Sequence, residues 1–263
     1  MLKFSLSIFT LVFVIVRLSA QTENEPNQTD SFWSTETSVK WMSNYQPYGV
    51  EINDGTAFSG SLGFSHSDGF YTDFDCIYLS GISEIENWTA AVGYDYEFNS
   101  VLSATAEYSY TQYSSTATTV FSSLNHGLSF SFDAELPWDI SASLFFDHYF
   151  GNLPASYYGL SVSSYFKLGG FSFIPILQAT MVSQTVETSL LKSPKSGKQL
   201  SAGTTKNISG FSNFGVLSVI IYPITDQIKL TATPSFLITP NSNLTTGSSQ
   251  FNLSVGIKYG FDF

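Results

Sequence analysis

The chain has 263 residues, enough for one domain of ordinary to large size, and carries 10 Lys and Arg against 21 Asp and Glu. The formal net charge of −11 argues against nucleic acid as a partner, because affinity for phosphate backbones depends on basic side chains. Only 12% of the residues are charged, whereas typical soluble domains have roughly 25%, and 16% are aromatic. We therefore expect a largely uncharged outer surface that suits lipid.

The first twenty residues predict a secretory signal peptide. Lys3 supplies a positive start, an apolar run continues to Val16, and a small-x-small sequence ends at Ala20. An uncleaved membrane anchor is disfavoured because a spanning helix needs about 20 apolar residues. We expect cleavage after Ala20, a flexible periplasmic leader over 21–34, and one domain over 35–263.

From residue 35 onward, apolar residues alternate with small or polar ones, which predicts β-strands with one apolar face. Most of the expected strands are long enough to cross a bilayer at a tilt, whereas strands of soluble proteins average about 5–6 residues. We predict twelve strands, over 35–45, 57–66, 70–80, 87–98, 101–113, 126–135, 139–150, 155–167, 171–183, 209–222, 227–239 and 250–263.

The connections between these strands fall into two groups. Those after even-numbered strands, such as Ser67-Asp68-Gly69 and Asn99-Ser100, are short and rich in turn formers. Those after odd-numbered strands are mostly longer, and the longest covers 184–208. A soluble sandwich also alternates but has no reason to sort its loops. The pattern predicts an all-β transmembrane antiparallel barrel with short periplasmic turns and longer extracellular loops.

The last strand ends in regularly spaced aromatic residues, Tyr259, Phe261 and Phe263. This spacing resembles the C-terminal β-signal of bacterial outer-membrane proteins, which the barrel-assembly machinery recognises. The resemblance implies localisation in the outer membrane of a Gram-negative bacterium. It also implies outer-membrane lipid, lipopolysaccharide and the assembly machinery as partners.

A second resemblance lies near the N-terminus, in the strand that ends with Ser43-Asn44-Tyr45 and in the Gly63-to-Tyr71 segment after it. It is similar to an uncharacterised family of bacterial barrel-like proteins that open with a strand ending in Ser-x-Tyr. Tyr48 stands where that family often has Arg. The resemblance implies an outer-membrane location and no established activity.

The chemistry-bearing residues are few. His66, His126 and His148 lie at or near strand ends without metal-ligand spacing, and Cys76 has no partner for an internal disulfide. Barrel lipases carry a His-x-Ser pair on one strand, and none of the three histidines matches that pattern. We expect no enzyme activity, no metal and no cofactor.

Setting the apolar face of each strand outward assigns the other face to the lumen. Acidic residues then point inward from strands three to seven, and lysines from strands one, eight, eleven and twelve. The expected lumen-lining residues are Asp73, Asp75, Asp95, Glu97, Glu107, Asp133 and Asp147 on the acidic side, and Lys40, Lys167, Lys229 and Lys258 on the basic side. We expect the acidic strands to face the lysines across the barrel, which would produce an electric field across a pore for small polar solutes.

A closed barrel with a structural or surface-adhesion role remains the alternative, because small barrels often fill their interior with side chains. Inward charges would then pair with one another. The bulky inward residues Tyr71, Ile77, Phe145 and Tyr165 would obstruct a pore if they pointed toward its axis. The lysine-rich loop 184–208 would constrict the lumen, contact lipopolysaccharide or remain in solvent.

Two further features concern the strands. Pro175 and Pro234 fall inside expected strands, where a proline cannot donate a ladder hydrogen bond, so they indicate a bulge or a shifted boundary. Aromatic residues cluster near strand ends, which is typical of the girdles at membrane interfaces. The expected girdle residues are Trp88, Phe98, Tyr110, Tyr113, Trp138, Tyr149, Phe150, Tyr157, Tyr158, Tyr222, Phe261 and Phe263.

Overall fold

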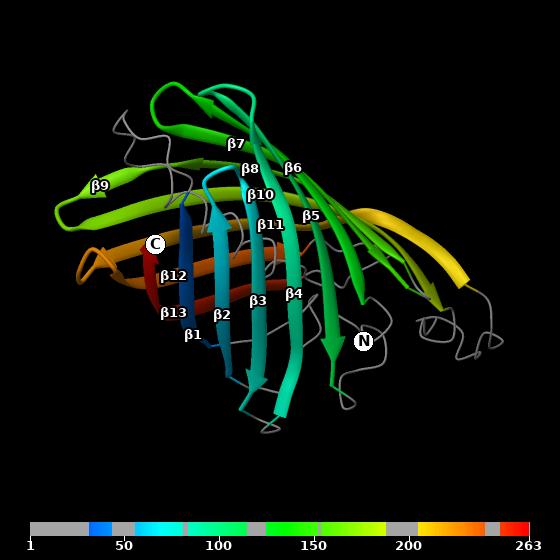
Figure 1. The fold of residues 1–263 in the computed structure, drawn as a ribbon. Coiled ribbons are helices and arrows are strands. Elements are labelled where there is room, and N and C mark those ends of the chain that lie inside the picture. The colour runs from blue at the N-terminus through cyan, green and yellow to red at the C-terminus, as the bar shows by residue number, and fades with distance from the viewer. Residues whose placement is uncertain are drawn as a thin grey trace.

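The computed structural model describes residues 32–43, 56–80, 84–114, 125–151, 154–187, 205–239 and 248–262. These residues form a single sheet (Figure 1). Its first strands are β1 (Trp33–Met42), β2 (Ala57–His66), β3 (Phe70–Leu79), β4 (Glu84–Glu97), β5 (Leu102–Tyr113), β6 (His126–Leu136) and β7 (Ile140–Phe150). The others are β8 (Ala155–Ser164), β9 (Phe166–Leu168), β10 (Phe171–Glu187), β11 (Thr205–Pro223), β12 (Ile228–Thr239) and β13 (Ser248–Asp262). No helix in these ranges is long and apolar enough to cross a membrane.

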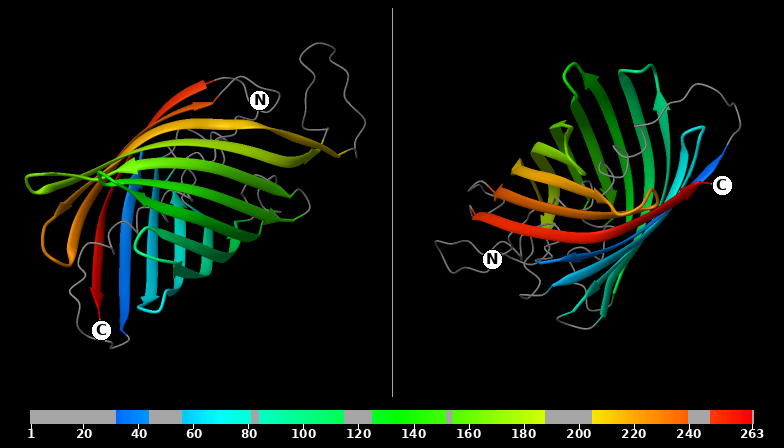
Figure 2. Two further views of the ribbon diagram at one scale, coloured as in Figure 1. Left: turned by 90° about the horizontal axis from the view of Figure 1, so that it is seen from above. Right: turned by 90° about the vertical axis from the view of Figure 1, so that its left-hand side faces the viewer.

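The sheet closes on itself. Successive strands pair antiparallel, with β8 pairing to β10 past the short β9, and β13 pairs with β1. The short β9 continues the path of β8 and pairs with the start of β10, so the ring has twelve strands and one extra segment. The predicted twelve-strand antiparallel barrel is confirmed. In Figure 1, β10 to β13 cross behind β1 to β5 at a steep angle, because the strands are strongly tilted, and Figure 2 shows the same sheet from above and from one side.

Most strand boundaries match the expected ones within a few residues, and three differences stand out. β1 begins at Trp33, so the start of the barrel lies two residues before the expected 35. β10 and β11 extend farther than 171–183 and 209–222, and they stay paired as far as Glu187 opposite Thr205. Both ends of the expected loop 184–208 are therefore strand. Residues 1–31, which include the expected signal peptide, and 188–204 lie outside the described residues.

The short connections gather at one end of the barrel, which we call the turn end; the opposite end is the loop end. The left-handed backbone conformations of the turns occur there, at Gly69 (φ 98°), Gly169 (φ 62°), Trp138 (φ 68°) and Asp139 (φ 55°). Positive φ at consecutive residues suits the right-handed twist of hairpin strands. The predicted sorting of turns is therefore confirmed at this end.

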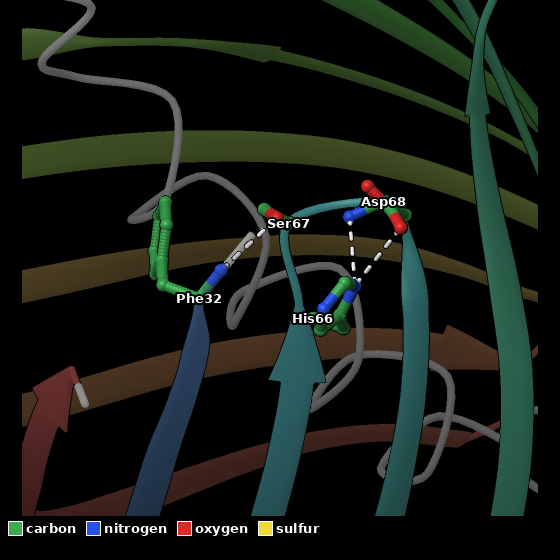
Figure 3. Close-up of polar contacts among 4 residues, drawn as sticks. All are labelled: Phe32, His66, Ser67 and Asp68. Carbon is green, nitrogen blue, oxygen red and sulfur yellow. Dashed lines mark hydrogen bonds and ion pairs between the residues drawn. The ribbon is translucent and has the colours of Figure 1, made fainter. Parts of the chain in front are cut away.

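Side chains fasten the first of these turns (Figure 3). The backbone N–H of Asp68 donates to Nδ1 of His66 at 3.2 Å, and a carboxylate oxygen of Asp68 lies 3.4 Å from the same nitrogen. The backbone N–H of Phe32 donates to Oγ of Ser67 at 3.3 Å. The β2–β3 turn is thereby joined to the residue that precedes β1.

Both prolines lie within strands, at gaps in the hydrogen-bond ladder. Pro175 pairs with Ser218 of β11, but on its other side the ladder stops between the β9 and β8 pairings, where Tyr165 interrupts the strand. Pro234 pairs with Leu253 of β13 and falls where the β11–β12 ladder is broken. The missing proline donor explains each gap, and the strand assignments themselves are retained.

The outer face of the sheet is apolar and exposed. Side chains such as Val39, Phe132, Leu144 and Leu177 point outward, and Leu144 is 59% exposed. Most of the expected girdle residues within the described ranges belong to this face. Tyr113, Tyr149 and Tyr157 are exceptions, because the register places them on the inner face, and Tyr113 and Tyr157 are buried. These three tyrosines lie at strand ends as expected, but the expectation that they face the membrane is wrong.

Candidate functional site

The inner face of the barrel carries hydroxyl groups in cross-strand rows. One row runs over five consecutive strands and consists of the hydroxyl residues Ser38, Ser61, Thr89 and Thr111, with the carboxylate of Asp75 in the middle. The hydroxyls of Ser38 and Ser61 lie 2.6 Å apart, and those of Thr89 and Thr111 lie 2.9 Å apart. Such rows make the inner face polar, whereas the outer face is apolar.

Large inner side chains lie over glycines. In each case the glycine is the direct register partner of the large residue on the adjacent strand, and a Cβ on that glycine would press against the large side chain. The aromatic pairs are Tyr71 with Gly93, Phe145 with Gly159 and Tyr149 with Gly127, and Leu237 lies in the same way over Gly215. These side chains therefore lie along the wall instead of pointing toward the barrel axis.

Tyr71 shows the arrangement most clearly. Its ring crosses Gly93 of β4, and its hydroxyl donates to Oε2 of Glu107 on β5 at 2.8 Å. The side chain thus spans three strands along the wall. A residue that would obstruct the lumen in an upright rotamer is held flat by a glycine and a carboxylate.

The predicted lysines of β12, β13 and β1 lie close together. Lys258 is directly opposite Lys229 in the β12–β13 pair, and it forms an ion pair with Glu36 of β1. The charge of Lys40 interacts with that of Asp75 on β3. The expectation that all acidic strands face the lysines across the barrel is therefore wrong. The first acidic strand, β3, lies on the same side of the barrel as the lysines. Only the later acidic strands lie across the ring, since β6 is half a ring away from β13.

The predicted carboxylates of β4 to β7 have hydroxyl neighbours. Thr105 donates to Asp95 at 2.7 Å, and Ser131 donates to Asp133 at 3.0 Å. Glu107 receives the Tyr71 hydroxyl, and Asp147 is 3% exposed between its register partners Ser129 and Tyr157.

Two predicted residues lie near the turn end. Glu97 is exposed at the end of β4, where it is the register partner of Ser103. Lys167 is exposed on β9, in the hairpin that projects beyond its neighbours in Figure 1. Lys167 is therefore peripheral to the inner face.

Sequence reasoning missed Glu36 and Glu135 on the inner face, and it also missed Glu86, which is buried at the register shift of β3 and β4. Glu36 shares the inner face of β1 with Ser38 and Lys40, and Glu135 receives a hydrogen bond from Ser141 at 2.8 Å. Both follow the same alternation as the residues that were predicted, at positions two or four residues away. The alternation of apolar and polar residues therefore assigns both carboxylates to the inner face, although each stands at the edge of an expected strand.

The inner face of β10 and β11 differs from the rest. Ile174, Ile176, Leu217 and Val219 form an apolar cluster of which each member is at most 2% exposed, and Tyr165 packs against it. Tyr165 and Ser172 also share a hydrogen bond of 2.8 Å. Of the four bulky inward residues, Tyr71 and Phe145 thus lie over glycines, whereas Tyr165 and Ile77 belong to buried clusters.

Two histidines on the outer face pair with hydroxyl groups. Nδ1 of His148 lies 2.8 Å from Oγ of Ser156 on the next strand, and Nδ1 of His126 lies 2.6 Å from the hydroxyl of Tyr108. A search for His-x-Ser on one strand cannot find the first pair, because it joins two strands. Within the described ranges, no carboxylate is hydrogen-bonded to either ring.

The described part of the expected β-signal lies in β13. Tyr259 faces outward and is 37% exposed, opposite Thr37 of β1. The side chain of Phe261 and the whole of Phe263 lie outside the described residues, as do Asn44 and Tyr45 of the N-terminal motif.

Solved structures with the same architecture include outer-membrane porins and channels. The KdgM porin is similar with a TM-score of 0.51 at 12% identity, over 88% of this chain and 99% of that one. The NanC porin gives 0.51 at 11% identity, over 86% and 98%. An outer-membrane channel of Pseudomonas putida F1 gives 0.52 at 14% identity, over 91% and 100%. KdgM has also been solved in complex with disordered oligogalacturonate, and that structure gives a TM-score of 0.53 at 14% identity, over 87% and 99%.

At these identities the likeness shows the fold. The chain has the closed antiparallel β-barrel fold of outer-membrane porins. No family model and no characterised protein sequence matches it. The likeness to the uncharacterised barrel family therefore rests on its N-terminal motif alone.

Proposed function

We propose that the protein is a passive channel of the bacterial outer membrane for small polar solutes. The observation that carries this proposal is the placement of large inner side chains over glycines. Tyr71 and Phe145 would obstruct the lumen if they stood upright, and they lie along the wall instead. A barrel that only needed a filled interior would have no use for glycines opposite its largest inner residues.

The outer face supports a membrane location. It carries many exposed large apolar side chains, and a closed barrel satisfies the hydrogen bonds of its backbone without an open edge. In water, so many exposed large side chains would favour aggregation. In a bilayer they contact lipid, so outer-membrane lipid and lipopolysaccharide are the partners we propose for this face.

The two sides of the inner face suggest where solutes pass. The carboxylates and hydroxyls of β3 to β7 are mostly half-buried, whereas the apolar cluster of β10 and β11 is fully covered. We place the path along the β3–β7 wall, which offers water-like hydrogen-bonding partners. The similar KdgM porin has been solved with oligogalacturonate, which is polar and anionic, so the comparison supports a polar solute and not a particular charge.

A non-conducting structural or adhesive barrel is the second candidate. The full burial of Val219, Thr180 and Asn213 on the inner face favours it, because a wall that faces open water would be exposed. The two candidates differ in whether ions cross the barrel.

Single-channel recording distinguishes them. The protein is recovered folded from the outer membrane of an expressing bacterium and inserted into a planar bilayer, and its resistance to heat unfolding in detergent verifies the fold. Steady conductance that rises with salt concentration supports the channel. Folded protein that inserts and passes no current would overturn it and leave the structural role.

We also propose that the barrel has no enzymatic role. The His148–Ser156 pair is the strongest contrary feature, and it lies on the outer face flanked by Phe146 and Phe150. A phospholipid hydrolysis assay in mixed micelles, with Ser156→Ala as the control, tests this. Product release that depends on Ser156 would contradict the proposal.

Export and assembly complete the proposal. Residues 1–20 would direct export and be removed, so the N-terminus of the protein in the outer membrane would be Gln21, which mass spectrometry measures. Tyr259, Phe261 and Phe263 would be recognised by the barrel-assembly machinery. Phe263→Ser should then lower the amount of folded barrel in the membrane. Phe251→Ser, at the other end of β13, is the control and should lower that amount less, because it leaves the recognised residues in place.

A further inference from the structure

The proposed channel has a charge preference that its fold does not imply. Resting on the channel function proposed above, we infer that the lumen admits small inorganic cations, organic amines and neutral polar solutes in preference to anions. The inference comes from how each charged side chain of the inner face is paired. Lys40 and Lys258 have acidic partners on their own side of the barrel, whereas three carboxylates near the turn end of β4 and β6 have no lysine partner within the described ranges.

Two of the three lysines of β1, β12 and β13 are offset on their own side of the barrel, and the third, Lys229, lies directly opposite Lys258. Lys258 is ion-paired with Glu36, and Lys40 interacts with Asp75. Asp73 also acts on Lys258. Close opposite charges cancel at distances beyond the pair, so Lys40 and Lys258 contribute little to the field in the middle of the lumen.

Three carboxylates on the acidic side have only hydroxyl groups or solvent beside them among the described residues. Asp133 and Glu135 on β6 receive hydrogen bonds from Ser131 and Ser141, and these hydroxyls stabilise the carboxylates without neutralising them. Glu97 is exposed near the same end of β4, two strands away. None of these three carboxylates forms an ion pair with a lysine in the described part of the chain.

The position of these carboxylates explains their effect on solutes. They lie toward the turn end of β4 and β6, across the ring from Lys229 and Lys258. A solute that passes along the proposed β3–β7 path meets fixed negative charge at that end of the barrel. Low-dielectric walls focus such a field, so cations are concentrated there and anions are depleted.

The reversal potential in a salt gradient tests the inference. The protein is recovered folded from the outer membrane, and KCl is set about tenfold higher on one side at roughly 0.1 M on the dilute side, where the Debye length is about 10 Å. We expect the potassium permeability to exceed the chloride permeability. The preference should fade near 1 M salt, where the Debye length falls to about 3 Å.

The decisive variants remove charge and keep shape. Asp133→Asn and Glu135→Gln should each lower the potassium-to-chloride permeability ratio about twofold, the effect of one screened unit charge at pore distance. Asp139→Asn is the matched control, because it removes the same charge from an exposed turn position. Replacing potassium by tetramethylammonium and chloride by gluconate extends the test to organic ions.

The outcomes separate the two proposals. A cation preference that falls in the β6 variants and persists in Asp139→Asn supports the inference. Steady conductance with anion preference overturns the inference, and so does an ion preference that is equal in the unmodified protein and the three variants. Either result leaves the proposed channel function standing. Folded protein without conductance overturns the channel and the inference together.

Discussion

The ring of Phe145 on β7 lies over Gly159, its register partner on β8, so that a single methyl group added to the glycine would collide with the ring. The two residues are 14 positions apart along the chain and touch because the β7–β8 hairpin sets their register. This contact makes a large aromatic side chain of the inner face part of the wall. It makes the pore hypothesis testable by a one-carbon change.

Gly159→Ala should displace the Phe145 ring toward the lumen. We expect a lower single-channel conductance and a loss of about 1–3 kcal/mol of stability from overpacking. The double variant Phe145→Ala/Gly159→Ala should conduct at least as well as the unmodified protein. Gly260→Ala is the matched control on the inner face, because the nearest atom to its added Cβ, the backbone oxygen of Thr35, is 3.5 Å away. Unchanged conductance in Gly159→Ala would mean that Phe145 does not border the path.

Tyr71→Phe should destabilise the barrel by about 1 kcal/mol, because it removes a hydrogen bond to the Glu107 carboxylate and leaves the ring in place. Tyr165→Phe loses a hydrogen bond of the same length to neutral Ser172 and should cost less, about 0.5 kcal/mol. Urea unfolding midpoints of the two variants in lipid vesicles measure the difference. A larger loss in Tyr165→Phe would contradict the role assigned to Glu107.

Replacing either member of the Lys258–Glu36 ion pair alone should lower the stability of the barrel. Glu36→Gln leaves Lys258 beside Lys229 without its partner, and Lys258→Gln strands the carboxylate. Both side chains retain some exposure, so we expect about 1–2 kcal/mol for each, less than for a fully buried pair. The double variant should lose less than the sum of the two, as a double-mutant cycle of unfolding midpoints will show. Strict additivity would argue that the two charges do not interact.

A charge on the outer face tests whether lipid surrounds it. Leu144→Arg should destabilise the barrel in vesicles by about 2–4 kcal/mol, the cost of a cation near the bilayer midplane. Ser103→Arg adds the same group to the inner face, opposite both Glu97 and Asp133, and should be tolerated. The fraction of heat-resistant folded barrel reports on both variants. Equal tolerance would contradict the membrane-facing assignment of β7.

Much of this fold could be predicted because its signals are local. Alternation along each strand identifies an apolar and a polar face, and the two classes of connection identify two ends. These features placed the strands to within a few residues and recovered the ring. Tyr113, Tyr149 and Tyr157 show the limit, because aromaticity near a strand end does not specify whether the ring meets lipid or the interior. Only the register of each strand fixes the face.

The sequence by itself determined the number and direction of the strands, the apolar outer surface and the set of charges available to the inner one. The tertiary structure decided how those charges meet, since Lys258 and Glu36 are more than 200 residues apart and become neighbours only when β13 closes on β1. It also decided that Tyr71 and Phe145 lie flat, because a glycine on one strand makes room for a ring on the next only in one register. Local pattern fixes what each face carries, and cross-strand pairing fixes what each residue touches.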